Sequence, residues 1–185
     1  MKINNTKNDI IFTAIKLMTK NGIKQTSLAD ISKACNISKG TLYYYYPTKD
    51  DLILDISTIH LNTITNTVLQ CVYEISENNS PKNMINLIIK KMSKLKYRSR
   101  IHVYILCEAI TSNERLKLLI TEKYSQWQKS LKEEIKKVYK NEKESDALAF
   151  LLISIVDGLV VQATLQNNKN INYESIANLL VDKLV

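Results

Sequence analysis

Apolar residues recur at intervals of three and four along almost the whole chain, which is the spacing of one buried helical face. Only three glycines and two prolines interrupt this pattern, whereas an all-β fold would need turn residues about every ten positions. We therefore expect an all-α protein of about nine helices. The expected helices lie near residues 6–21, 27–35, 38–46, 48–77, 81–100, 101–110, 111–139, 145–165 and 173–184.

Local capping chemistry predicts where these helices begin and end. A hydroxyl side chain can accept a hydrogen bond from a free N–H group of the first turn, and an acid three residues later can return it. Gly22 is expected to end the first helix, and Pro47 prevents the third helix from continuing past Tyr46. Pro81 is a favoured first residue for the fifth helix. The predicted capping residues are Thr6, Ser27, Ser38, Thr48 and Thr111, and residues 141–144 are expected to form a charged loop.

The eighth predicted helix is unusually apolar. Residues 147–156 are apolar around most of the helix circumference, so they need cover on nearly every side, which is more than one chain of this size supplies. The same stretch is shorter than a bilayer span, and the N-terminus lacks the apolar core of a signal peptide. We therefore expect a cytoplasmic protein without a membrane partner.

Charge is concentrated at the N-terminus. The formal net charge is +8, and residues 1–50 hold eight lysines against three aspartates, which leaves the rest of the chain with only +3. A basic first quarter suggests attraction to a polyanion, either nucleic acid or an acidic membrane, although a merely soluble basic surface remains an alternative.

The first three predicted helices have the dimensions of a helix-turn-helix unit, because a turn of about three residues joins the last two. The second helix of such a pair lies in the major groove. Its exposed residues would offer an ammonium group, hydroxyl groups and closely approachable backbone to DNA. The alternative is an aromatic core cluster at residues 43–46, and we expect this of Tyr45 and Tyr46 but not of Tyr43 and Tyr44. The predicted exposed residues are Lys39, Gly40, Thr41, Tyr43 and Tyr44.

Residues 26–52, which read TSLADISKACNISKGTLYYYYPTKDDL, resemble the signature of TetR-family transcriptional regulators. The resemblance covers about residues 8–55, and beyond them it is one of layout only. The aromatic residue before the fourth helix is present as Tyr46, followed by Lys49 and Leu52. Asn36 replaces the common glycine in the turn, and asparagine also adopts the left-handed conformation.

The resemblance implies a helix-turn-helix DNA-binding domain at residues 1–47 and a helical ligand-binding and dimerisation domain at residues 48–185. It implies a repressor that a small-molecule effector releases from a palindromic operator in double-stranded DNA. An activator or a ligand-independent architectural factor of the same fold is the alternative. The implied phosphate contacts are Thr26, Ser38, Tyr43, Tyr44 and Lys49, and the implied base contacts are Lys39, Gly40 and Thr41.

Two further expectations follow for these sites. Lys49 falls in the first turn of the fourth helix, where the positive end of the helix dipole also favours a phosphate. A recognition helix of about two turns discriminates weakly alone, so two copies on a palindrome are needed. The natural interface of a homodimer is helices 145–165 and 173–184, with Gly158 allowing close approach, and burial of both helices within one chain is the alternative.

The effector cannot be identified from the residues. Glu108 and Asp157 are carboxylates inside apolar helices, so each needs a partner, which can be a cationic ligand, a lysine or a helix cap. The basic surface leaves an anionic ligand open, and the cationic run at residues 90–100 is either a solvated helix end or an anion site. The candidate effector contacts are His102, Tyr104, Cys107, Glu108, Tyr124, Trp127 and Asp157, each of which has ordinary core or surface packing as its alternative.

Enzymatic and metal-binding roles are not expected. His102 and Cys107 are five residues apart on one helix and point in different directions. The sequence has no glycine-rich phosphate loop or paired-carboxylate motif, and its three cysteines and two histidines lack the spacing of a zinc site. We therefore expect no enzyme activity, no cofactor and no metal.

Overall fold

The computed structural model describes residues 2–78, 87, 99–138, 142–165 and 172–184. Within these residues the chain forms eight helices and no strand, which confirms the all-α prediction. The helices are α1 (Lys2–Asn21), α2 (Leu28–Ala34), α3 (Lys39–Tyr45), α4 (Lys49–Asn78), α6 (Ser99–Thr111), α7 (Glu114–Val138), α8 (Glu142–Leu165) and α9 (Tyr173–Leu184).

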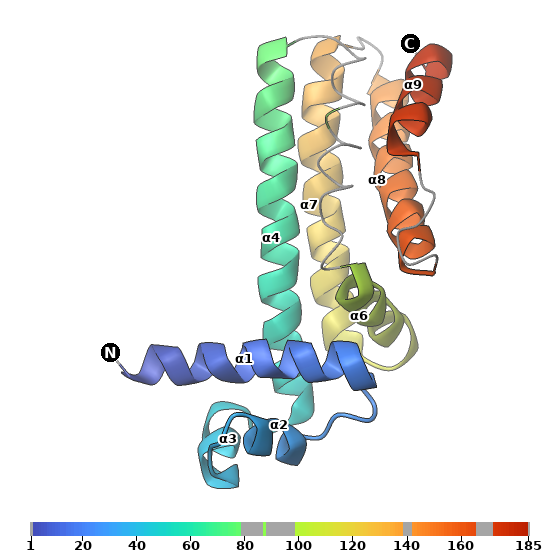
Figure 1. Cartoon of the computed structure of the whole chain (residues 1–185). Coiled ribbons are helices and arrows are strands. Elements are labelled where there is room, and N and C mark those ends of the chain that lie inside the picture. The colour runs from blue at the N-terminus through green and yellow to red at the C-terminus, as the bar shows by residue number, and fades with distance from the viewer. Residues whose placement is uncertain (1, 79–86, 88–98, 139–141, 166–171, 185) are drawn as a thin grey trace.

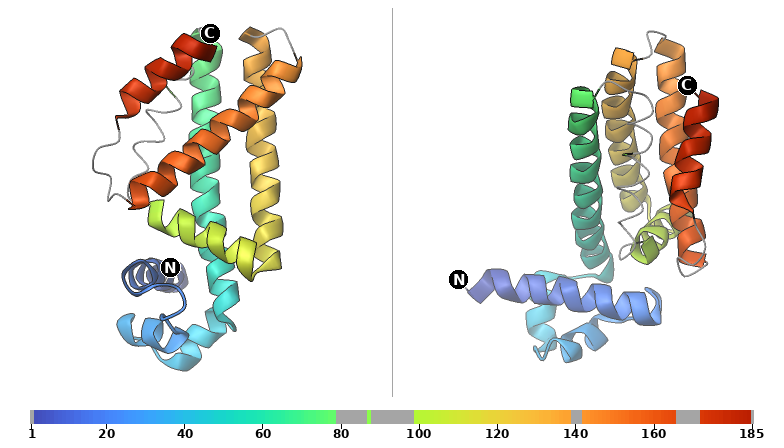
Figure 2. Two further views of the ribbon diagram at one scale, coloured as in Figure 1. Left: turned by 90° about the vertical axis from the view of Figure 1, so that its right-hand side faces the viewer. Right: turned by 45° about the horizontal axis from the view of Figure 1, so that its top comes forward.

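The helices form a small head and a larger body, joined by one long helix (Figure 1). In the head, α2 contacts both α1 and α3, and α1 crosses the lower part of α4. In the body, α4 and α7 lie side by side, and α6 contacts both α7 and α8. Figure 2 shows α8 crossing α7 at an angle. Helix α4 therefore runs from the head into the body as one continuous element.

The apolar core continues through this junction. The first turns of α4 bury Leu52, Ile53 and Ile56 in the same cluster as the head residues, and the cluster extends up the body. Removing this much apolar surface from water is the main favourable contribution to folding. The core residues with almost no exposed surface include Ile10, Ala14, Met18, Ile31, Leu42, Leu61, Ile105, Leu116, Ile135 and Leu152.

Local capping fixes the bounds of the head helices as predicted. The Ser27 hydroxyl accepts a 3.1 Å hydrogen bond from the Asp30 N–H, and the Asp30 carboxylate accepts the Ser27 N–H at 2.9 Å. The Ser38 hydroxyl accepts the Thr41 N–H at 3.0 Å and so caps α3. Asn36 takes the left-handed conformation with φ 54°, which confirms its role as a substitute for glycine in the turn.

Three predicted helix starts are wrong. Helix α1 begins at Lys2 and not near Thr6, and residues 2–6 contain no glycine or proline to interrupt it. Helix α7 is capped by Asn113, whose side chain accepts the Leu116 N–H at 2.9 Å, while Thr111 still belongs to α6. Helix α8 begins at Glu142, so residues 142–144 are helical and not a loop, in keeping with the high helix propensity of Glu and Lys. The predicted fifth helix and most of the cationic run 90–100 lie outside the described residues.

The apolar stretch of α8 is longer than predicted from the sequence. Within the described chain, Lys143–Leu165 is long and apolar enough to cross a membrane by length and composition alone. The prediction considered residues 147–156 only, whereas the helix adds a second apolar half after Asp157. One face packs on the core through Leu148, Leu152 and Val156. Its other face is exposed, and this face includes Phe150, Leu151, Val161 and Leu165.

Candidate nucleic-acid interface

Helix α3 presents one buried and one exposed surface. Leu42 is completely buried and anchors the helix to the head core, which leaves the neighbouring positions free to face outward. Tyr43 keeps 49% and Tyr44 83% of their surface exposed, and tyrosine is a residue of intermediate burial in most proteins. Ser38, Lys39, Gly40 and Thr41 are exposed as well.

The four consecutive tyrosines divide as predicted. Tyr46 is 3% exposed and Tyr45 is half-buried, so these two rings complete the head core. The Tyr44 ring meets the edge of the Tyr45 ring at a centroid distance of 5.4 Å and an angle of 83°. This edge contact supports an exposed ring without covering it.

Two predicted phosphate contacts are engaged inside the protein. Thr26 is 1% exposed, and its hydroxyl donates a 2.9 Å hydrogen bond to the Gly22 carbonyl. The Lys49 ammonium donates to the carbonyls of Ile23 and Lys24 in the loop between α1 and α2. Thr26 therefore stabilises this loop, and Lys49 attaches the loop to the first turn of α4.

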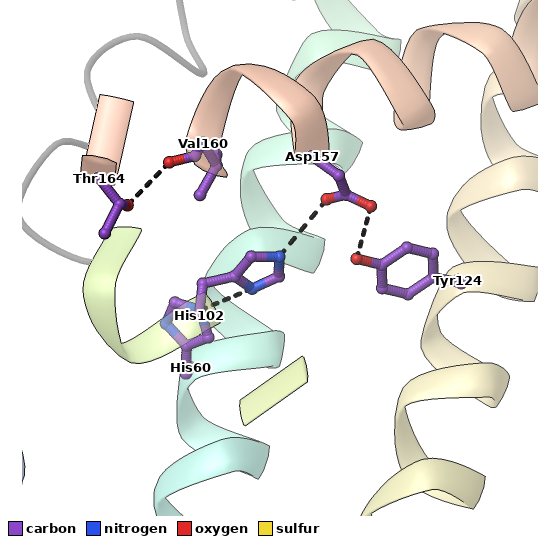
Figure 3. Close-up of polar contacts among 6 residues, drawn as sticks. All are labelled: His60, His102, Tyr124, Asp157, Val160 and Thr164. Carbon is purple, nitrogen blue, oxygen red and sulfur yellow. Dashed lines mark hydrogen bonds and ion pairs between the residues drawn. The ribbon is translucent and has the colours of Figure 1, made fainter. Parts of the chain in front are cut away.

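The body contains a chain of polar side chains contributed by four different helices (Figure 3). His60 Nε2 of α4 lies 3.1 Å from His102 Nδ1 of α6, and both rings are buried. His102 Nε2 lies 3.4 Å from Asp157 Oδ1 of α8. The Tyr124 hydroxyl of α7 donates to Asp157 Oδ2 at 2.8 Å. We call these four residues the body polar chain.

The Asp157 carboxylate sets the direction of these hydrogen bonds. A carboxylate oxygen accepts, so His102 donates to Asp157 through Nε2–H, and its Nδ1 atom accepts from His60 Nε2–H. Burial and the Asp157 charge both raise the pKa of the Tyr124 phenol well above its usual value, so Tyr124 remains a donor. The hydrogen bonds of the body polar chain therefore run from His60 to His102, from His102 to Asp157, and from Tyr124 to Asp157.

The structure brings together four of the seven candidate effector residues. His102, Tyr124 and Asp157 belong to the body polar chain, and the Trp127 ring lies 5.0 Å from the Tyr124 ring between centroids. Tyr104 is half-buried against the core. Cys107 is exposed, and Glu108 accepts a 2.8 Å hydrogen bond from the Ser112 hydroxyl, so these two lie apart from the cluster.

Sequence reasoning missed two polar residues of α4. His60 bonds to His102, and the Thr65 hydroxyl accepts the Trp127 indole N–H at 2.8 Å. The signal for His60 was present, because it lies four residues from both Ile56 and Ile64 on the buried face of the helix. In the described part of the chain, no group of three His, Cys, Asp or Glu side chains is placed to hold a metal ion.

Sequence comparisons with known proteins match mainly the head of the molecule. Residues 10–56 match the family described as bacterial regulatory proteins, tetR family. IcaR from Staphylococcus epidermidis, the negative transcriptional regulator of the biofilm operon icaADBC, is 46% identical over 46 residues, which is 25% of this chain and 25% of IcaR. The chain matches less than half the length of each curated relative.

Solved structures extend the likeness to nearly the whole chain. A transcriptional regulator from Saccharomonospora viridis in complex with choline superposes with a TM-score of 0.77 at 19% identity, over 97% of this chain and 95% of that one. FadR from Bacillus subtilis in complex with stearoyl-CoA gives a TM-score of 0.73 at 19% identity, over 96% of both chains. The head therefore matches the tetR family of bacterial regulatory proteins, and the chain as a whole shares the all-helical fold of these solved regulators.

Proposed function

We propose that the protein is a sequence-specific DNA-binding transcriptional repressor that a small molecule releases from a palindromic operator. The exposed surface of α3 is the single observation that carries this proposal. It gathers the Lys39 ammonium group, a glycine and the hydroxyl groups of Thr41, Tyr43 and Tyr44 on a helix that Leu42 anchors in the core. The family is regulatory and not enzymatic, and IcaR is named as a negative regulator.

Gly40 gives this surface its strongest argument. A Cβ atom at Gly40 would meet only the Ser38 hydroxyl, at an ordinary 3.7 Å, so nothing within the chain requires glycine there. Glycine inside a helix costs roughly 0.5–1 kcal/mol relative to alanine. Close approach of DNA backbone or base edges explains why a position with space for a side chain has none.

The exposed residues of α3 and its cap are assigned to two kinds of DNA contact, as the family resemblance implies. Lys39, Gly40 and Thr41 are assigned to base edges, while Ser38, Tyr43 and Tyr44 are assigned to phosphates. Thr26 and Lys49 are not assigned to DNA, because their polar groups bond to the loop between α1 and α2. The first turn of α4 remains a phosphate site through its backbone N–H groups.

A homodimer supplies a second recognition helix for the other half of a palindromic operator. The exposed apolar face of α8 includes Phe150 at 64% and Leu165 at 73% exposure, and Leu179 on α9 is 61% exposed. A Cβ at Gly158 would meet nothing within 4 Å, so a partner helix has room to approach closely. A second copy of α8 and α9 covers these residues in an intersubunit four-helix bundle.

The effector acts on the body, close to the body polar chain. Asp157 retains 29% of its side-chain surface, and it is the acceptor on which the donors of α6 and α7 converge. An effector that competes for Asp157 changes the contacts of both helices at once. The neighbouring folds are seen with ligands as different as choline and stearoyl-CoA, so the fold leaves the class of ligand open.

A fluorescence-anisotropy titration tests the proposal at near-physiological salt, with the DNA upstream of the protein's own gene and a scrambled duplex of equal length. We expect Gly40→Ala to raise thermal stability slightly and to weaken operator binding about tenfold, the cost of one lost base contact. Lost stability cannot explain that combination.

Lys39→Ala and Tyr43→Ala serve as further variants, and Lys117→Ala on the exposed surface of α7 is the control. Equal and salt-sensitive binding of the wild-type protein to both duplexes would instead indicate an architectural factor. Once an operator is known, its release by a candidate compound separates a ligand-released repressor from a ligand-independent regulator.

A further inference from the structure

The Asp55 carboxylate joins three elements of the head. It lies in the second turn of α4, and its Oδ2 atom accepts the Tyr46 hydroxyl at 2.7 Å and the Lys7 ammonium at 2.8 Å. Tyr46 ends the recognition helix as its C-cap residue, and Lys7 belongs to α1. The Lys7 ammonium also lies 5.9 Å from the centre of the Tyr46 ring, which favours a cation over the aromatic face.

The electrostatics of Asp55 favour a charged carboxylate. Partial burial acts to raise the pKa of Asp55, but the hydrogen bonds and charge from Lys7 and Tyr46 outweigh it and lower the pKa below its ordinary value. Burial and the same carboxylate raise the pKa of the Tyr46 phenol, which therefore keeps its proton. A phenol donating to a carboxylate is a strong, charge-assisted hydrogen bond.

Two arginine contacts between body helices and the head are longer than the bonds of Asp55. The Arg100 guanidinium of α6 donates to the Thr19 carbonyl of α1 at 3.4 Å, and Arg115 of α7 lies 3.4 Å from Asp51 at the start of α4. Both arginine contacts are exposed to solvent, where such pairs contribute little. The bonds of Asp55 are shorter and involve a phenol that is almost completely buried.

We propose that Asp55 is a positioning residue that fixes the recognition helix and α1 to α4, so that the two recognition helices of a dimer keep the spacing the body sets. This inference rests on the proposed function. Specific recognition requires both helices to meet their half-sites in one fixed geometry, whereas non-specific attraction to phosphates does not. A loosened joint therefore lowers specific binding selectively.

The variants Asp55→Asn and Tyr46→Phe test this role. Asparagine still accepts the Tyr46 hydroxyl but gives Lys7 no charge, and phenylalanine removes only the hydroxyl. We expect each variant to weaken operator binding about tenfold or more, as losing one hydrogen bond to a charged group implies, with binding to a scrambled duplex within about twofold of wild type. Asp55→Glu keeps the charge and should recover most of the affinity.

Glu122→Gln is the control, because Glu122 is an exposed acid on α7, outside both the head and the proposed dimer interface. We expect the control to bind both duplexes as the wild-type protein does. Equal weakening toward both duplexes by Asp55→Asn and Tyr46→Phe would overturn the positioning role, and so would no change toward either duplex.

A second measurement separates this inference from the proposed function, because it needs no DNA. Hydrogen exchange of the α3 amides should quicken severalfold in Asp55→Asn, while the α7 amides keep their wild-type rates. Unchanged exchange in α3 would overturn the positioning role even if operator binding is confirmed. Quickened exchange in a protein that binds both duplexes equally would support the positioning role of Asp55 and contradict sequence-specific operator binding.

Discussion

The head and the body reach their structures by different routes. In the head, the short helices α2 and α3 have bounds set by residues within four positions of each end, such as the Ser27 and Ser38 caps and the turn at Asn36. In the body, long helices meet through residues far apart in sequence, such as His60 with His102 and Tyr124 with Asp157. The head is thus defined mainly by local chemistry, and the body by long-range pairing.

The head and the body also differ in the kind of surface that they expose. The exposed residues of α3 are polar or amphipathic, and they suit a charged, hydrated partner such as DNA. The exposed residues of α8 are apolar, and they suit another apolar helix surface. Breaking each surface should therefore give a different failure, with folding of the individual chain retained in both cases.

The largest effect is expected from Phe150→Glu on α8. A charge in the centre of the proposed dimer interface should convert the dimer to a monomer, measured by light scattering after size-exclusion chromatography. Operator affinity should fall about 100-fold, because binding of the second half-site is no longer intramolecular.

Ile110→Glu is the control for this prediction, since Ile110 is 78% exposed on α6 and outside the proposed interface. A Phe150→Glu protein that remains a dimer would place the interface elsewhere. Recovery of the wild-type protein in the membrane fraction of cells would instead assign the apolar face of α8 to lipid.

Substitutions in the body polar chain should have non-additive effects on the free energy of unfolding, because His60 and His102 contact each other from different helices. His102→Leu removes two hydrogen bonds and leaves buried polar groups behind, which should lower the free energy of urea unfolding by about 1–3 kcal/mol. His60→Leu should have a similar cost, and the double variant should cost less than the sum by at least about 0.5 kcal/mol.

Cys107→Ala is the matched control on α6, because Cys107 is exposed on another face of the same helix. Strictly additive costs of the two histidine substitutions would show that the His60–His102 contact does not stabilise the fold.

The smallest effect is expected from acid. Hydrogen bonds from Ser27 and Thr48 are the main reason why the pKa values of Asp30 and Asp51 are lowered, and Lys7 and Tyr46 lower that of Asp55 against the effect of burial. A lowered carboxyl pKa contributes stability that is complete above about pH 4 and is lost as pH falls through the folded-state value. The head should therefore loosen in acid before the body does.

Amide NMR spectra recorded from about pH 6 down to about pH 2.5 would follow this loss, with signals from α2 and α3 broadening first. Simultaneous loss of head and body signals would show that the two regions unfold as one cooperative unit.

Most of the head could be predicted from sequence because its signals are local. The Ser27 and Ser38 caps, the left-handed Asn36 and the division of the four tyrosines needed only neighbouring residues. The helix starts at Lys2 and Glu142 were missed because strong helix formers can extend a helix beyond a plausible cap.

The body site was only partly predictable for the opposite reason. Spacing could identify Asp157 as a carboxylate in need of a partner, but its partners are 55 and 33 residues away, so no local pattern reveals them. Lys49 shows the same limit within the head. Its position favoured phosphate, but its ammonium bonds to a loop 25 and 26 residues earlier in the chain.

The indole of Trp127 offers one practical consequence. It is the only tryptophan in the chain, it is 4% exposed, and its N–H group reaches across from α7 to Thr65 on α4. Its emission should therefore report the separation of these two helices without an attached dye. An effector that moves the helix carrying the head would then produce an optical signal from a native residue.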